Sequence, residues 1–365
     1  MLCTRLLADM GAEVIRVEKP DTHSDERTAD FCYLNAGKRS ISLDLEKEEG
    51  RKLFKRLAAG ADIVVETMPP GYLASLHLGY PDLSKENPGL VMASITDFGQ
   101  SGPYRDYKSC DLVAGALGGW LSVCGEPEAP LNPYGHQAYY AASLFAANGI
   151  LLALLGRHDT GRGQYLDISV MECVAATLDH VMVRYFYEGA VSKRQGSLYG
   201  NRAFRILPCR DGYILLSLFQ QWETLVEWLD SEGMAGDLTD VKWRDREKRL
   251  KNLDRIIAVL GKWTMSHNVA ELVEKGQLMR FPWAEVASIA SLERNPQLAE
   301  RNYFVEVESG GGKYKVPGIP CKLSRSPWRA GGRAPDKGDD NTAIYCHELG
   351  ISEAEIDALA KDGVI

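Results

Sequence analysis

The sequence predicts an α/β protein with a second, smaller α+β region. Residues 13–18, 62–66 and 90–95 are short apolar runs bounded by turn residues, a pattern typical of buried strands. Helical stretches separate these runs, and the alternation of strands with helices indicates a parallel sheet. Residues 204–218 instead contain two β-rich runs around one tight turn, which predicts an antiparallel hairpin.

The first elements fit one end of a doubly wound sheet. Residues 4–10 have the spacing of a helix, and Gly11 can end it as a C-cap because glycine tolerates the left-handed conformation. The strand 13–18 follows, and residues 47–59 form an amphipathic helix. A doubly wound sheet usually has a strand before such a helix, so we expect one upstream of residue 4.

The longest apolar segment lies at the centre of the chain. Residues 137–156 predict a helix that is apolar on nearly all sides, and we therefore expect it to be buried. Gly161 stands in a Thr-Gly-Arg-Gly turn that can end this helix, and residues 165–170 then alternate as a strand. Polar residues and glycine interrupt the apolar run, which falls short of the ~20 residues needed to span a bilayer.

The second half of the chain combines a helix, two hairpins and large packing residues. Residues 171–189 are helical, Asp211-Gly212 is a tight turn, and residues 305–316 predict a second hairpin around a glycine turn at 310–312. That turn lacks the Ser or Thr of a phosphate-binding loop, because Tyr314 follows its lysine. Four tryptophans predict core packing: Trp222, Trp228, Trp243 and Trp263.

Two helices are expected at the end of the chain, over residues 342–349 and 352–361. Ser352 is the expected N-cap of the second helix, and Glu355 stands three residues later, where it completes a capping box. An irregular segment rich in Pro, Gly and Arg, residues 324–341, comes before them.

Composition narrows the classes of function. The 365 residues are enough for two domains, and the net charge of −8 argues against nucleic-acid and anionic-membrane partners. The eight cysteines show no C-x-x-C pair and the seven histidines no metal-ligand spacing, so we expect neither a disulfide framework nor a metal. No signal peptide is visible, and we expect a cytoplasmic protein.

Three motifs carry a resemblance to a known family. They are N-A-G-K-R-S-I-S-L-D-L at 35–45, F-G-Q-S-G-P-Y at 98–104, and R-H-D-T-G-R-G-Q at 157–164, which follows the long apolar helix. Together they resemble the family III CoA-transferases, the formyl-CoA and carnitine CoA-transferase group. The resemblance runs along the whole chain and implies that acyl-CoA and a carboxylic acid are the substrates, with no metal.

The resemblance also implies where the domains begin and end. The resemblance implies a large Rossmann-like, CoA-binding domain built from both chain ends, residues 1–190 and 335–365. It implies a small α+β domain over 200–325, with linkers at 190–200 and 325–335. Members of this family form interlinked dimers, and we expect one here.

The family also implies which residues contact CoA. A basic pair beside a turn glycine suits a phosphate, because a guanidinium offers a two-pronged donor. The resemblance places phosphate and nucleotide contacts on Lys19, Lys38, Arg39 and Lys108. It places Leu43, Thr67, Met68 and Tyr72 around the adenine.

The family's nucleophile is missing from this sequence. In the family, an aspartate near the start of the apolar helix attacks the acyl-CoA thioester. Ungapped counting from Thr160 puts its position on Tyr139, and no Asp or Glu lies between Glu128 and Asp159. An aspartate of pKa ~3.9 is ionised at neutral pH and a tyrosine of pKa ~10 is not, so we identify no confident catalytic residue.

Several functions remain open at this point. The chain is either the non-catalytic subunit of a heteromeric transferase, as in the succinyl-CoA:(R)-benzylsuccinate type with its two unequal subunits, or a stand-alone CoA-binding pseudoenzyme. In the first case its partner is a paralogue that keeps the aspartate. A weaker alternative is an active homodimer that uses Asp111. A racemase is weaker still, because Cys110 stands where family racemases have a histidine.

Overall fold

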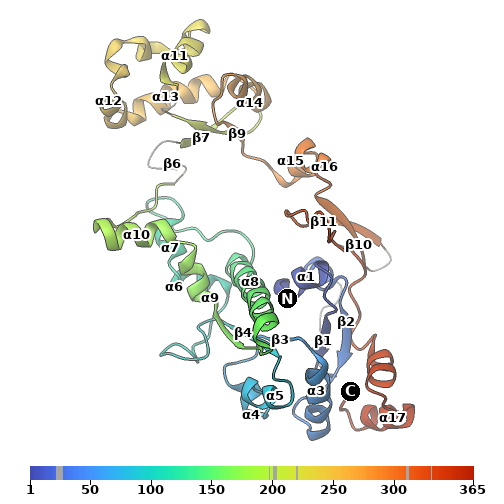
Figure 1. Cartoon of the computed structure of the whole chain (residues 1–365). Helices are drawn as coiled ribbons and strands as arrows, with labels where there is room; N and C mark the ends of the chain where they lie inside the picture. The colour runs from blue at the N-terminus through green and yellow to red at the C-terminus, as the bar shows by residue number, and fades with distance from the viewer. Residues whose placement is uncertain (22–27, 197, 200–203, 219–220, 310–311, 330) are drawn as a thin grey trace. The chain divides into compact units, whose positions relative to one another are not determined.

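The computed structural model describes residues 1–21, 28–196, 198–199, 204–218, 221–309, 312–329 and 331–365 (Figure 1). These residues divide into two compact units, each described here by itself. Unit 1 contains residues 1–120, 132–191 and 296–365, and unit 2 contains residues 121–131 and 192–295.

Unit 1 contains two parallel sheets. In the first, β1 (Ile15–Glu18) pairs with β2 (Arg39–Ser42). In the second, β3 (Ile63–Glu66), β4 (Val91–Thr96) and β5 (Tyr165–Ser169) lie in that order. The prediction of an α/β fold is confirmed. The strands do not join into one continuous sheet, so the Rossmann-like description stays a prediction.

Helices cover the faces of these sheets. Helix α1 (Leu2–Asp9) and helix α8 (Gln137–Thr160) pack on β4, where Cys3, Leu7, Val91 and Ile150 form one buried cluster. Helix α3 (Glu48–Gly60) contributes to two further clusters, one with each sheet. The remaining helices of unit 1 in this half of the chain are α2 (Ala29–Asn35), α4 (Tyr72–Ser75), α5 (Tyr80–Glu86), α6 (Asp111–Leu117), α9 (Val170–Ala176) and α10 (Asp179–Glu188). Helix α7 (Trp120–Val123) begins at the last residue of this segment of unit 1, and its residues 121–123 belong to unit 2.

Two expectations for helices need correction. The helix expected over 171–189 is two helices, α9 and α10, which separate at Thr177 and Leu178. The prediction that the long apolar helix is buried was wrong for much of its surface. In α8, Leu144, Phe145 and Leu152 are 51%, 47% and 67% exposed in this chain, because α1, β4, β5, α6 and α9 cover only part of the helix.

The length of α8 also differs from the expectation. Its 24 residues make it, within the described part of the chain, the one helix long and apolar enough to cross a membrane by length and composition. Gly161 ends it with a φ of +69°, as predicted for a left-handed C-cap. Its contacts with β4 and β5 make α8 the central helix of unit 1.

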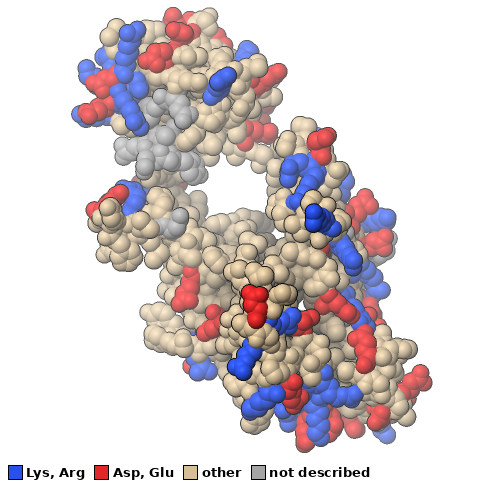
Figure 2. All heavy atoms as spheres, in the orientation of Figure 1, with Lys and Arg blue, Asp and Glu red and all other residues tan. Residues whose placement is uncertain are grey.

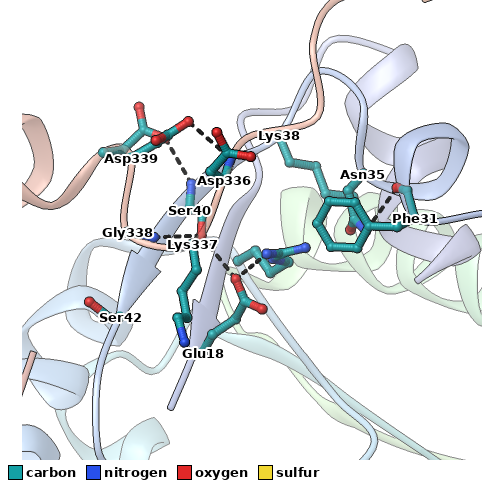
Figure 3. A network of polar contacts seen from close by, with 12 residues as sticks. Glu18, Phe31, Asn35, Lys38, Ser40, Ser42, Asp336, Lys337, Gly338 and Asp339 are labelled. Atoms are coloured by element: carbon teal, nitrogen blue, oxygen red, sulfur yellow. Dashed lines mark hydrogen bonds and ion pairs between the residues drawn. The ribbon is translucent and has the colours of Figure 1, made fainter. Parts of the chain in front are cut away.

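The C-terminal segment closes the free edge of β2. The Ser40 N–H donates to the Asp340 carboxylate over 2.8 Å, and the Ser42 N–H donates to the Asn341 amide oxygen over 3.0 Å. Figure 3 shows Gly338, whose N–H donates to the Ser40 hydroxyl over 3.2 Å, beside this strand. Side chains of the tail therefore replace a neighbouring strand and protect an edge that would otherwise be open to pairing.

Further elements of the tail complete unit 1. Strands β10 (Phe304–Ser309) and β11 (Gly312–Pro317) form the expected antiparallel hairpin, although residues 310 and 311 of its turn lie outside the described residues. Helix α16 (Pro296–Glu300) precedes it. A π-helix, η3 (Ala343–Glu348), and α17 (Glu353–Lys361) end the chain, and the predicted Ser352–Glu355 capping box is present.

The boundary of the units differs from the predicted small domain, which extended to residue 325. The hairpin β10–β11 packs against α2, and the Gly37 N–H donates to the Arg333 carbonyl over 3.1 Å. These contacts join the segment after residue 295 to unit 1. The boundary between Val191 and Ser192 lies inside the predicted linker 190–200.

Unit 2 is an antiparallel sheet with helices around a tryptophan-rich core. The sheet order is β6 (Leu198–Tyr199), β7 (Phe204–Pro208), β8 (Tyr213–Ser217) and β9 (Ala284–Glu285), and the β7–β8 hairpin confirms the Asp211-Gly212 prediction. All four predicted packing tryptophans are buried. The helices are α11 (Trp222–Ser231), η1 (Gly236–Thr239), η2 (Val241–Arg244), α12 (Arg246–Lys251), α13 (Leu253–Thr264), α14 (Val269–Leu278) and α15 (Ile289–Glu293).

Candidate functional site

The candidate site lies at the carboxyl ends of β3 and β4, where parallel sheets usually bind ligands. Hydrogen bonds tie the loops there to each other. The Asp167 carboxylate on β5 accepts from the Gln100 N–H over 3.0 Å, and the Gln100 side-chain oxygen accepts from the Gly71 N–H over 3.2 Å. The loop after β3 and the loop after β4 are therefore held in one arrangement.

Tyr139 lies in the first turn of α8, next to two carboxylates. Its backbone N–H donates to the Asp111 carboxylate over 3.0 Å, and its hydroxyl donates to the Asp97 carboxylate. Asp97 directly follows β4, and Asp111 is the first residue of α6. The helix start has no cap from its own N-cap residue, His136, so Asp111 supplies the acceptor that this turn needs.

The environment keeps Tyr139 protonated. Burial and the neighbouring carboxylate of Asp97 raise the pKa of Tyr139 to about 12. Burial also raises the pKa of Asp97, and the nearby Asp111 charge adds to this effect. A hydroxyl with such a pKa carries its proton at neutral pH and is a weak nucleophile.

Two of the predicted phosphate ligands are engaged inside unit 1. Lys38 is buried, and its ammonium group donates to the Met1 carbonyl over 3.2 Å and to the Asn35 amide oxygen over 3.1 Å. Figure 3 shows Lys38 beside Asn35 and Phe31. Burial lowers the pKa of Lys38 to about 7. Arg39 forms ion pairs with Glu13, Asp340 and Glu348. Their role as phosphate contacts stays a prediction.

The other predicted CoA contacts divide between two places. Lys19 and Tyr72 meet at Glu46, with the Lys19 ammonium 3.0 Å from the Glu46 carboxylate and the Tyr72 hydroxyl 3.5 Å from it. Leu43, directly after β2, is buried in a core cluster with Ile41 and Leu53. The exposed residues are Thr67 and Met68, directly beyond β3, and Lys108, before α6.

Two residues of this region were missed at the sequence level. The sequence contained a pattern that could have identified Asp97, because a polar residue directly after a buried strand lies at the ligand-binding edge of a parallel sheet. For Arg105, the sequence offered no such pattern beyond its place after the Gly/Pro turn. Its guanidinium donates to the Pro70 carbonyl over 3.1 Å and lies so close to Gly71 that a Cβ there would be 2.7 Å from it.

The chain is similar to known proteins along nearly its whole length. The sequence profile of CoA-transferase family III matches residues 1–341. The chain belongs to this family. The resemblance that the three motifs predicted is confirmed, and the family's members use CoA thioesters as substrates.

Similar family III CoA-transferases cover nearly the full length of the chain. The BbsE subunit of succinyl-CoA:(R)-benzylsuccinate CoA-transferase from Thauera aromatica is 33% identical over 99% of this chain and 93% of that protein. The alpha subunit of succinyl-CoA–L-malate CoA-transferase from Chloroflexus aurantiacus is 29% identical over 99% and 88%. The crystal structure of a CAIB/BAIF family protein from Brucella suis superposes with a TM-score of 0.83, with 27% identity over 95% and 94% of the two chains.

Proposed function

We propose that this chain is the non-catalytic subunit of a heteromeric acyl-CoA:carboxylate CoA-transferase. Its partner is a paralogue that carries the catalytic aspartate. The observation that carries the proposal concerns Tyr139, which stands where counting from the family motif puts the nucleophile. Its hydroxyl keeps its proton and forms a hydrogen bond to the Asp97 carboxylate. Two relatives that are similar over nearly their whole length are themselves named as subunits.

The neighbouring carboxylates are poor replacements for the missing nucleophile. Asp111 is buried, and its oxygen accepts the Tyr139 N–H at the start of α8. Attack on a thioester would turn this carboxylate into an uncharged anhydride and weaken the acceptor that caps α8. Asp97 accepts the Tyr139 hydroxyl, which stabilises the carboxylate and lowers its nucleophilicity. Both groups therefore serve the structure of this region.

Exposed apolar side chains support the presence of a partner chain. In α8, Leu152 and Leu155 are 67% and 66% exposed, and in α10, Phe186 and Tyr187 are 77% and 90% exposed. Large apolar side chains gathered on a protein surface usually mark an interaction site. An interlinked dimer with the paralogue would cover them.

In the proposed reaction, chemistry occurs on the partner. The partner's aspartate attacks the acyl-CoA thioester, which gives a mixed anhydride and CoA thiolate. The acceptor carboxylate then displaces the donor carboxylate from this anhydride, and the CoA thiolate attacks the acceptor's acyl carbon, which forms the new thioester and releases the aspartate. This chain contributes the CoA-binding scaffold, with the contacts assigned above to Lys19, Lys38, Arg39, Lys108, Leu43, Thr67, Met68 and Tyr72. We propose a cytoplasmic location, which suits the use of CoA thioesters.

A stand-alone CoA-binding pseudoenzyme is the second candidate, because the state of Tyr139 fits it equally well. The two are separated by measuring CoA transfer from succinyl-CoA to a panel of carboxylates. The protein is assayed alone and then co-expressed with its paralogue. We expect transfer only in the mixture, and we expect Tyr139→Phe in this chain to retain it.

Two results would contradict the proposal. Absence of transfer and of complex formation in the mixture would favour the stand-alone protein. Transfer by this chain alone that survives Tyr139→Phe would show an active homodimer, and Asp111→Asn would then test the remaining carboxylate.

A further inference from the structure

Unit 2 carries a concentration of positive charge that the proposed function does not use. Residues 242–255 contain seven Lys and Arg residues against three Asp and Glu residues, whereas the whole chain has a net charge of −8. Figure 2 shows these basic side chains gathered around α12, with acidic side chains between them. A local excess of cations in an acidic protein attracts anions to that face.

A pocket lies within this basic segment. It has a volume of about 460 Å³, inside the range of roughly 300–1,000 Å³ that is usual for small-molecule sites. Its lining combines three cations with a carboxylate, an amide and an indole, which belong to Lys242, Lys248, Arg255, Asp237, Asn252 and Trp243.

One carboxylate already lies among the cations of this pocket. The Asp237 carboxylate accepts from two nitrogens of the Arg255 guanidinium, at 2.9 and 3.2 Å, and lies 3.7 Å from the Lys242 ammonium. Lys242 also pairs with Asp240 at 3.3 Å. The ammonium of Lys248 forms no ion pair with any residue that the structure describes. The three cations of the lining therefore carry more positive charge than the Asp237 carboxylate neutralises.

The indole of Trp243, which lines this pocket, is buried with a donor left unsatisfied by the described residues. Its side chain is 4% exposed, and its Nε1–H has no hydrogen-bond acceptor among the described residues. A buried donor without an acceptor is rare in folded proteins, because it costs free energy. The Lys242 ammonium lies 5.3 Å from the centre of the indole ring, and both residues line the pocket.

We propose that this pocket binds a small dianion through phosphate or carboxylate oxygens. The anion accepts the Trp243 Nε1–H and pairs with the ammonium groups of Lys242 and Lys248, while the Arg255 guanidinium is shared between the anion and Asp237. The site lies wholly within unit 2 and uses none of the residues assigned to CoA. Its test is therefore independent of CoA transfer.

The proposal is tested by the nuclear magnetic resonance signal of the Trp243 indole N–H. The chain contains seven tryptophans, and Trp243→Phe identifies the resonance of this indole in a nitrogen-15 spectrum while it keeps an aromatic ring in the core. The full-length protein is titrated with inorganic phosphate and, separately, with succinate at constant ionic strength. We expect a saturable shift of the Trp243 resonance, and the tighter of the two anions identifies the chemistry. A resonance that shifts with neither anion would overturn the proposal.

Three variants are expected to weaken anion binding, to tighten it and to leave it unchanged, respectively. Arg255→Gln should weaken binding about tenfold, because a charge-assisted donor is lost. Asp237→Asn should tighten it severalfold, because the competing carboxylate is removed. Lys251→Gln is the matched control, since Lys251 is 77% exposed on α12 and does not line the pocket. Equal weakening by all three variants would indicate general screening and would overturn the site.

Discussion

Two helices of unit 1 begin in contrasting ways. The N-terminus of α17 is capped by its own sequence, where the Ser352 hydroxyl accepts the Glu355 N–H and the Glu355 carboxylate accepts the Ser352 N–H. The N-terminus of α8 is capped from outside, by Asp111, which lies 28 residues before Tyr139 in the sequence. A local cap fixes one exposed turn, whereas a distant cap ties a helix start to another element. The second kind ties Tyr139 to the start of α6.

The largest expected effect in this comparison is that of Asp111→Ala. The change leaves the Tyr139 N–H without its acceptor at a partly buried helix start, and we expect a loss of roughly 2–3 kcal/mol of unfolding free energy. Urea denaturation of the isolated chain measures it. Asp111→Asn keeps an oxygen acceptor and is the matched control, so a loss as large as that of the alanine variant would show that charge rather than capping is responsible.

Tyr139→Phe should have an intermediate effect that depends on pH. The pKa of Asp97 is already raised in the folded chain, so its contribution to stability falls as pH rises above the unfolded value of ~3.9. Loss of the tyrosine hydroxyl removes an interaction that lowers this pKa, and the pKa rises further. We expect a cost of roughly 1–2 kcal/mol at pH 7 and a smaller cost at pH 4, where a larger share of Asp97 is protonated and its carboxylate needs the tyrosine hydroxyl less.

Urea denaturation at the two pH values measures this difference. Asp97→Asn with Tyr139→Phe completes a double-mutant cycle, in which the pH dependence assigned to Asp97 should disappear. A cost of Tyr139→Phe that is the same at pH 4 and pH 7 would contradict the hydrogen bond as its cause.

Ser352→Ala should have the smallest effect. It removes one half of an exposed capping box, so we expect a cost of about 1 kcal/mol, confined to the last helix. Hydrogen exchange of the first turn of α17 measures it, because local fraying raises exchange there and leaves α8 protected. Faster exchange in α8 would show that the two helix starts are coupled and that the contrast between them is false.

The sequence alone was sufficient where the interacting groups lie close together along the chain. The left-handed Gly161 that ends α8, the Asp211-Gly212 turn and the Ser352–Glu355 box all depend on neighbours within a few residues. The three family motifs and the Tyr139 position also needed no structure, because they are patterns of residue type and spacing.

Only the tertiary structure decided features that depend on distant partners. Sequence periodicity cannot show which helices and strands cover α8, and the apolar helix predicted to be buried is therefore partly exposed. The Asp340 carboxylate that closes the β2 edge comes from a residue 300 positions after Ser40. Asp97 reaches the Tyr139 hydroxyl only because β4 ends beside the start of α8. Spacing along the chain determines local caps and turns, whereas burial, edge closure and the raised pKa of Tyr139 depend on groups that only folding brings together.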